Sequence, residues 1–250
     1  MLSLILDSHP DIVGIDETEF KIEQINDYVA GEKYHPAVSF KLPAASHVLW
    51  FPKKIPGIKV LWCMRDPRDV VLSMLNLKLD LGNSELPWAA NPRGARKEIE
   101  GIAKSLQQST GMDAALAGLY KNYQDIVAKD PFLWTREEMV YVAALCWRLK
   151  QELLPAYNDR GIAYRIVPYE MLVKEPEKTI REILSYIDIP WHANVLAHHQ
   201  LHSGVSAGDT RNDRPIDSRN TGKWKSSFDP QSLDIIKTLC FSVAAQYGYE

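Results

Sequence analysis

Between residues 59 and 77, a short unbroken hydrophobic run gives way to hydrophobic positions at helical spacing. The run 60–64 contains no polar residue, which is typical of a strand buried on both faces of a parallel sheet. Asp66 can cap the helix that follows, Pro67 suits its first turn, and Asp69 lies where the acid of a capping box belongs. The pattern predicts a buried strand that is followed directly by a helix.

The same alternation continues along the chain. Residues 1–7 are typical of the end of a helix. Further strands are predicted at "DIVGI" (11–15), "AVSFKL" (37–42) and "IAYRIV" (162–167). Further helices are predicted at 112–129, from Thr135, where Glu138 completes a capping box, and from Pro176. Strands that alternate with helices indicate an α/β fold with a mostly parallel central sheet flanked by helices.

Two stretches depart from this alternation. Residues 80–111 are interrupted by glycine and proline, and residues 203–227 have almost no apolar periodicity. A loop as long as the second is usually functional or disordered. It carries basic residues around Trp224, which would suit the phosphates and the base of a nucleotide. A solvated hinge loop is the alternative interpretation.

Bulk properties exclude several classes of protein. The chain has 250 residues with 46% hydrophobic content, and we expect a single domain over 1–250. A net charge of −3 argues against broad binding to nucleic acid. No hydrophobic run is long enough to span a membrane. The three cysteines are far apart in apolar contexts, so we expect reduced core residues rather than disulfides or a zinc site.

Arg65 and Ser73 form the first candidate site. Arg65 follows the predicted strand, at the end where open α/β sheets bind ligands, and Ser73 lies on the same helical face as Asp66. An arginine, a hydroxyl and a helix N-terminus suit an anion such as phosphate. The alternative is a surface arginine paired with Asp66 or Asp69, and a serine bonded to its own helix. We expect the neighbouring Arg68 to point outward.

Four segments together resemble one enzyme family. They are "DSHPDIVGIDET" (7–18), "RDPRDVVLS" (65–73), "VPYEML" (167–172) and "RNTGKWKSSF" (219–228). In this order they resemble sulfotransferases that use 3′-phosphoadenosine 5′-phosphosulfate (PAPS), especially tyrosylprotein and related bacterial or Golgi-type enzymes. The resemblance implies a fold like that of the P-loop nucleotide kinases. It also implies PAPS as donor, adenosine 3′,5′-bisphosphate as product, a hydroxyl-bearing acceptor and no metal.

The resemblance assigns a nucleotide site. Arg65 and Ser73 match the motif that binds the 3′-phosphate, and Tyr169 matches a landmark that contacts adenine, although a tyrosine packed in the core is the alternative. Three residues of the late segment are expected to close over the 3′-phosphate side: Arg219, Gly222 and Lys223. Trp224 is expected either to stack on the base or to anchor the loop.

The resemblance also assigns catalytic candidates. Glu17 aligns with the glutamate that acts as general base in tyrosylprotein sulfotransferases, with Asp16 and Glu19 as local rivals. A histidine base is the other solution in the family, and His47 is the candidate for it. Lys41 resembles a strand-end lysine that faces the transferred sulfuryl group, with a solvated lysine as the alternative.

One family feature has no counterpart in the sequence. A loop resembling "PRSGTT", which cradles the 5′-phosphosulfate, and the strand before it are not found, so we expect an N-terminally truncated version of the fold. An inactive nucleotide-binding or scaffold homologue is therefore one alternative. A P-loop kinase is another, although no Walker lysine or magnesium ligands are found.

The acceptor and the location are less defined. A glycan hydroxyl, a protein tyrosine and a small metabolite are all candidates, and residues 80–111 and 130–136 are expected to line the acceptor entrance. His198 and His202 are spaced to share a helix face, yet no further ligand stands nearby, so we expect no metal. We expect a cytoplasmic protein; a Golgi enzyme would need an upstream membrane anchor.

Overall fold

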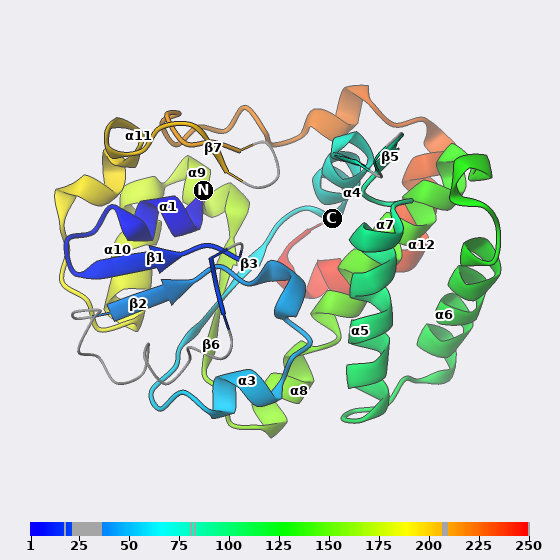
Figure 1. Cartoon of the computed structure of the whole chain (residues 1–250), viewed down its shortest axis with the longest axis horizontal. Coiled ribbons are helices and arrows are strands. Elements are labelled where there is room, and N and C mark those ends of the chain that lie inside the picture. Colours follow the sequence, from blue (N-terminus) through cyan, green and yellow to red (C-terminus); the bar gives the residue numbers. More distant parts are fainter. Residues whose placement is uncertain (18, 22–36, 81, 83, 207–209, 250) are drawn as a thin grey trace. The chain divides into compact units, whose positions relative to one another are not determined.

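The computed structural model describes residues 1–17, 19–21, 37–80, 82, 84–206 and 210–249 (Figure 1). They group into two compact units. The first, here called the strand unit, comprises residues 1–45, 50–64 and 163–218. The second, here called the helical unit, comprises residues 46–49, 65–162 and 219–250. The expectation of one domain over the whole chain stays a prediction.

The strand unit contains two pairs of parallel strands. β1 (Ile12–Ile15) pairs with β2 (Ala37–Phe40), and β3 (Val60–Met64) pairs with β6 (Tyr164–Pro168). Each pair forms a separate two-stranded sheet in the described part of the chain. The parallel direction and the flanking helices confirm the predicted α/β class, and all four strands lie where the hydrophobic pattern predicts them.

Helices cover these strands and close the core of the strand unit. The chief ones are α1 (Leu2–Asp7), α9 (Tyr169–Lys174) and α10 (Pro176–Tyr186). The buried core residues come from these helices, from β1 and β6, and from the turn after α10: Ile5, Leu6, Ile12, Val167, Leu172, Ile180, Ile183, Leu184 and Val195. The apolar spacing of residues 1–7 and of the segment after Pro176 therefore marks real buried faces.

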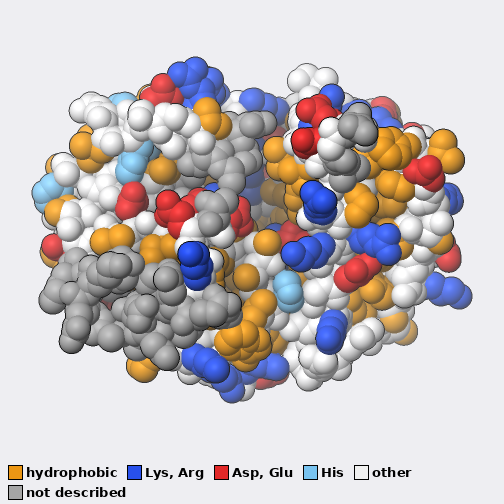
Figure 2. Space-filling view, viewed as in Figure 1, with side chains coloured by type: hydrophobic (Ala, Val, Ile, Leu, Met, Phe, Trp, Pro, Cys, Tyr) orange, Lys and Arg blue, Asp and Glu red, His pale blue; other side chains and the backbone are white. Residues whose placement is uncertain are grey.

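The helical unit is built around α7 (Arg136–Gln151). This helix packs against α4 (Pro67–Asn76), α5 (Lys97–Gln107), α6 (Ala114–Val127) and α12 (Pro230–Ala244). Thr135 and Glu138 form the predicted capping box at its start. On the face of this unit shown in Figure 2, Lys and Arg side chains are separated by acidic and apolar ones.

Shorter elements complete the two units. Two antiparallel pairs are β4 (Lys78–Asp80) with β5 (Glu85–Pro87), and β7 (Val205–Ser206) with β8 (Thr210–Arg211). The other short helices and helical turns are η2 (Pro43–Ala45), α3 (Trp50–Lys53), η3 (Pro92–Arg96), η4 (Pro131–Leu133), α8 (Leu154–Asp159), η5 (Ala193–Leu196), α11 (His198–Leu201), η6 (Lys223–Ser226) and η7 (Ala245–Tyr247). No helix in the described ranges is long and apolar enough to cross a membrane.

Two sequence-based expectations need correction. Residues 80–111 contain α5, a helix with a buried apolar face, whereas the glycines and prolines before it suggested an irregular stretch. Cys63 is exposed, whereas Cys146 and Cys240 are buried as expected. The reason is the alternation of a strand: Trp62 and Met64 are buried on one face, so Cys63 points to the other.

Candidate functional site

The candidate nucleotide site starts at the N-terminus of α4. The Asp66 carboxylate accepts a hydrogen bond of 2.8 Å from the Arg68 backbone N–H, and Pro67 occupies the first turn. Arg65 precedes this cap, and its backbone carbonyl accepts a 3.1 Å hydrogen bond from the indole N–H of Trp147 on α7. The cap and this bond fix the backbone from which the Arg65 side chain extends.

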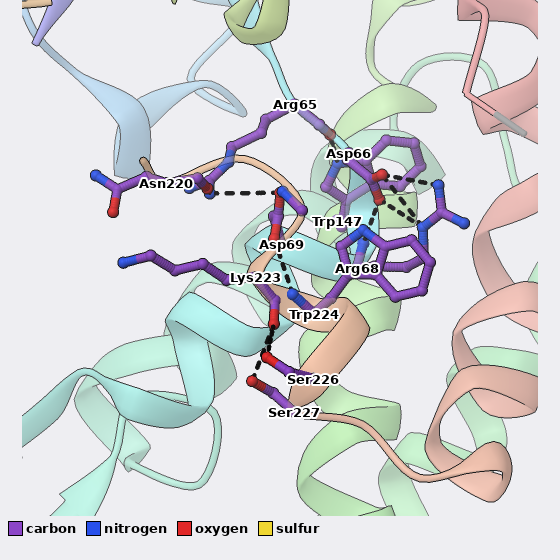
Figure 3. Close-up of polar contacts among 11 residues, drawn as sticks. Arg65, Asp66, Arg68, Asp69, Trp147, Asn220, Lys223, Trp224, Ser226 and Ser227 are labelled. Atoms are coloured by element: carbon purple, nitrogen blue, oxygen red, sulfur yellow. Dashed lines mark hydrogen bonds and ion pairs between the residues drawn. The ribbon is translucent and has the colours of Figure 1, made fainter. Parts of the chain in front are cut away.

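The Arg65 side chain reaches residues 219–228, here called the late loop. Its guanidinium donates to the backbone carbonyl of Asn220, and its Nη2 lies 3.7 Å from Oδ2 of Asp69 (Figure 3). The side chain remains 23% exposed. Both interpretations from the sequence therefore hold in part: Arg65 pairs with a neighbouring acid, and it also contacts the loop that the resemblance assigns to the nucleotide.

Asp69 anchors this late loop to α4. Its carboxylate accepts hydrogen bonds from the backbone N–H groups of Gly222, at 2.6 Å, and Trp224, at 3.3 Å. Gly222 has φ +71°, a left-handed conformation that favours glycine, so a bulkier residue there would be strained. Lys223 begins η6 and is exposed, and Figure 3 draws its ammonium on the same side of the view as Asn220.

Ser73 lies on the same face of α4 as Asp69. The two residues are one turn apart, so the hydroxyl of Ser73 is placed along the face of the helix that holds the loop. Ser73 is exposed, as is Arg219 at the start of the late segment. The structure thus gathers Arg65, Ser73 and the late loop in the helical unit.

The Arg68 side chain does not point outward, as the sequence suggested it would. Its guanidinium forms a bidentate pair with Asp66, with N–O distances of 2.8–3.2 Å. It also lies over two aromatic rings, 4.0 Å from the centroid of Trp224 and 5.1 Å from that of Phe241. The contact between Arg68 and Trp224 favours the interpretation of Trp224 as an anchor of the loop.

The catalytic candidates of the strand unit lie at the carboxyl ends of β1 and β2. Lys41 directly follows β2, and its Nζ lies 2.9 Å from Oδ2 of Asp16, which directly follows β1. The Lys41 backbone N–H donates to the Ile15 carbonyl at 3.0 Å. Glu17 is the next residue after Asp16 and is half-buried. Parallel pairing therefore brings all three candidates to one edge of the sheet.

His47 and Tyr169 are the remaining candidates from the sequence. His47 belongs to the helical unit and packs on α5, where a Cβ added at Gly101 would lie 2.5 Å from its Nε2. Tyr169 is the first residue of α9, directly after β6, and is half-buried. Its placement at the carboxyl end of a strand agrees with a ligand contact, but its contact with adenine stays a prediction.

Two described histidines of the strand unit, His202 and His198, lie in different surroundings. His202 Nε2 lies 3.0 Å from the Ser8 hydroxyl and 3.8 Å from an Asp7 oxygen. Among the residues described, no group of three or more His, Cys, Asp or Glu side chains could hold a metal ion. His198 is 2% exposed, and burial, followed by the charge of His199, lowers its pKa to about 4.

The depressed pKa of His198 predicts acid sensitivity. Between about pH 6.5 and 4 the unfolded chain binds a proton that the folded chain does not, so the free energy of unfolding falls as the pH falls through this range. We expect a loss of about 2–3 kcal/mol in urea denaturation of the unmodified protein. His198→Gln should remove most of this pH dependence, whereas His199→Gln should keep the larger part, which the burial of His198 causes. If His198→Gln retains the whole loss, another group is responsible.

This protein resembles a solved structure in its fold and matches a protein-family model in its sequence. A solved sulfotransferase domain from the curacin biosynthetic pathway shares the fold, with a TM-score of 0.51, 16% sequence identity, and coverage of 93% of this chain and 70% of that one. The protein therefore has the α/β fold of a sulfotransferase. A family model described as "Sulfotransferase domain" matches residues 22–248, and the chain belongs to this family.

The family match bears differently on the candidate residues. Its range contains Lys41, Arg65, Ser73, Tyr169 and the late loop, and it begins after Glu17. Members of the family generally use PAPS as the sulfate donor. Asp69 and Arg68 belong to the site although no sequence signal marks them as site residues; both lie in the "RDPRD" segment at the helix start.

Proposed function

We propose that this protein transfers a sulfuryl group from PAPS to the hydroxyl of an acceptor. The observation that carries the proposal is the contact between Arg65 and the late loop on α4, within a chain of the sulfotransferase family. A guanidinium, a serine hydroxyl and lysine or arginine side chains from a loop are suited to a phosphate group. In this proposal they hold the 3′-phosphate of the donor.

The proposed reaction is an in-line displacement at sulfur. The acceptor oxygen forms a bond to the sulfur atom, the bond from sulfur to the bridging phosphate oxygen breaks, and adenosine 3′,5′-bisphosphate leaves. Glu17 takes the proton of the acceptor hydroxyl. Lys41 compensates the charge on the sulfuryl oxygens, and its pair with Asp16 orients the ammonium group.

The acceptor is proposed to approach along residues 80–111 and 130–136. Within these ranges, Phe132 and Leu133 are 56% and 75% exposed, so the turn η4 presents apolar side chains to solvent. An apolar or aromatic part of an acceptor would gain binding energy by covering them. A phenol or a peptide tyrosine therefore suits this turn better than a bare sugar.

Transfer of label from the donor tests the proposal. The full-length protein is incubated with PAPS that is radiolabelled in the sulfuryl group, together with phenol, a tyrosine peptide or a glycan. We expect label on one of the acceptors and an equal amount of bisphosphate released, with no phosphoryl transfer when ATP replaces PAPS. Bisphosphate binding without transfer to any hydroxyl would favour the inactive nucleotide-binding homologue, and transfer from ATP would favour a kinase.

A further inference from the structure

We infer that Asp69 is a positioning residue of the nucleotide site, because it joins the late loop and the Arg65 guanidinium at one buried carboxylate. The inference rests on the proposed function, since it assigns this carboxylate a role in binding the 3′-phosphate of the donor. In the proposed reaction Asp69 touches neither donor nor acceptor. It acts through the groups that it holds.

The contacts of Asp69 divide between its two oxygens. Oδ2 accepts from the Gly222 N–H and faces Arg65 Nη2, while Oδ1 accepts from the Trp224 N–H. The Asp69 residue is 2% exposed. A buried carboxylate is costly unless donors compensate its charge, and here two amides and a guanidinium do so. The arrangement is therefore stable only while the loop and Arg65 stay in place.

A second contact, between Arg68 and the ring of Trp224, holds the same loop. Asp66 fixes the Arg68 guanidinium, and Arg68 lies 4.0 Å from the centroid of Trp224. The exposed residues at the start of the late segment, Arg219 and Asn220, bury little apolar surface that could fix their conformation. The two acids of "RDPRD" thus hold the loop in different ways: Asp69 through its backbone and Asp66 through the ring of Trp224.

The direction of the change in nucleotide affinity distinguishes a positioning role of Asp69 from simple electrostatic repulsion. A carboxylate beside a phosphate site would by itself repel the ligand, so its removal would tighten binding. If Asp69 positions Arg65 and the loop, removal of its charge weakens binding instead. Asp69→Asn keeps the size of the side chain but replaces one of the two acceptor oxygens with an NH₂ donor, so at least one loop amide loses its partner.

The experiment compares Asp69→Asn with a matched control, Glu98→Gln. Glu98 is another buried carboxylate of the helical unit, 6% exposed, and its Oε1 lies 2.5 Å from Lys150 Nζ. We expect Asp69→Asn to raise the Kd for adenosine 3′,5′-bisphosphate roughly 10–100-fold and the Kd for adenosine 5′-monophosphate less than about 3-fold. Native-state cleavage by trypsin at the exposed Lys223 and Lys225 should rise about 10-fold or more. Glu98→Gln should change neither readout.

The possible outcomes distinguish the inference from the proposed function. Unchanged or tighter bisphosphate binding by Asp69→Asn, with unchanged cleavage, would overturn the inference. If Asp69→Asn is cleaved faster, but the unmodified protein binds the bisphosphate no more tightly than adenosine 5′-monophosphate, the loop attachment is supported and the proposed function is contradicted. If Asp69→Asn does not fold, hydrogen exchange of the unmodified protein decides: slow exchange of the Gly222 and Trp224 amides supports the inference, and exchange at the rate of an unstructured loop overturns it.

Discussion

Glu17→Gln is expected to lower the rate of sulfuryl transfer by roughly 10²–10⁴-fold, because an amide cannot accept the proton of the acceptor hydroxyl. Glu17 follows β1 at the same sheet edge as Lys41, and the neighbouring Asp16 pairs with the Lys41 ammonium. The measurement is the steady-state rate with PAPS and a phenolic acceptor, made on the full-length protein. Binding of the bisphosphate should stay unchanged, because the group lost belongs to the acceptor side.

Glu19→Gln tests the other glutamate that rivals Glu17 as the base. Glu19 lies two residues further along and is exposed, so its substitution should leave the rate unchanged. If Glu17→Gln transfers sulfate at the rate of the unmodified protein, the role of the base passes to Glu19, His47 or Asp16, and a lower rate in Glu19→Gln would assign it to Glu19. Parallel substitutions, His47→Gln and Asp16→Asn, would then identify which one carries it.

Arg65→Ala is expected to weaken binding of adenosine 3′,5′-bisphosphate by about 1.5–3 kcal/mol, or roughly 10–150-fold. The substitution removes a guanidinium that is placed beside the late loop and remains partly exposed to solvent. It also leaves Asp69 without its cationic partner, so some loosening of the loop adds to the loss. Isothermal titration calorimetry measures the change.

Arg96→Ala controls for loss of a positive charge in the same unit. Arg96 is exposed and pairs with Glu100 at 2.9 Å, away from α4 and the late loop in sequence. It should alter bisphosphate affinity by less than about 2-fold, since surface ion pairs contribute little. Equal losses in both variants would mean that the nucleotide responds to overall charge rather than to a site at Arg65.

Local sequence signals predicted much of the framework around the site. The run 60–64 and the cap at Asp66 and Pro67 are read from adjacent residues, and the structure places β3 and α4 there. The capping box at Thr135 is equally local. Helix α5 is harder to predict because glycines and prolines precede it, although its residues Ile99, Ile102 and Leu106 have helical spacing.

The roles of Asp69 and Arg68 could not be read from local signals. Asp69 occupies the position of a capping-box acid, yet its carboxylate binds the amide of Gly222, 153 residues away. The sequence favoured an outward position for Arg68 because its aromatic partners, Trp224 and Phe241, also lie far along the chain. Contacts of this kind depend on tertiary packing, which neither hydrophobic periodicity nor capping preferences encode.

The most direct test of the 3′-phosphate site compares two nucleotides that differ only by that phosphate. The unmodified protein is titrated calorimetrically with adenosine 3′,5′-bisphosphate and with adenosine 5′-monophosphate under the same salt and pH. We predict that the bisphosphate binds at least about 10-fold more tightly, and that Arg65→Ala abolishes most of this difference. Equal affinity of the unmodified protein for both nucleotides would contradict the assignment of Arg65, Ser73 and the late loop to the 3′-phosphate.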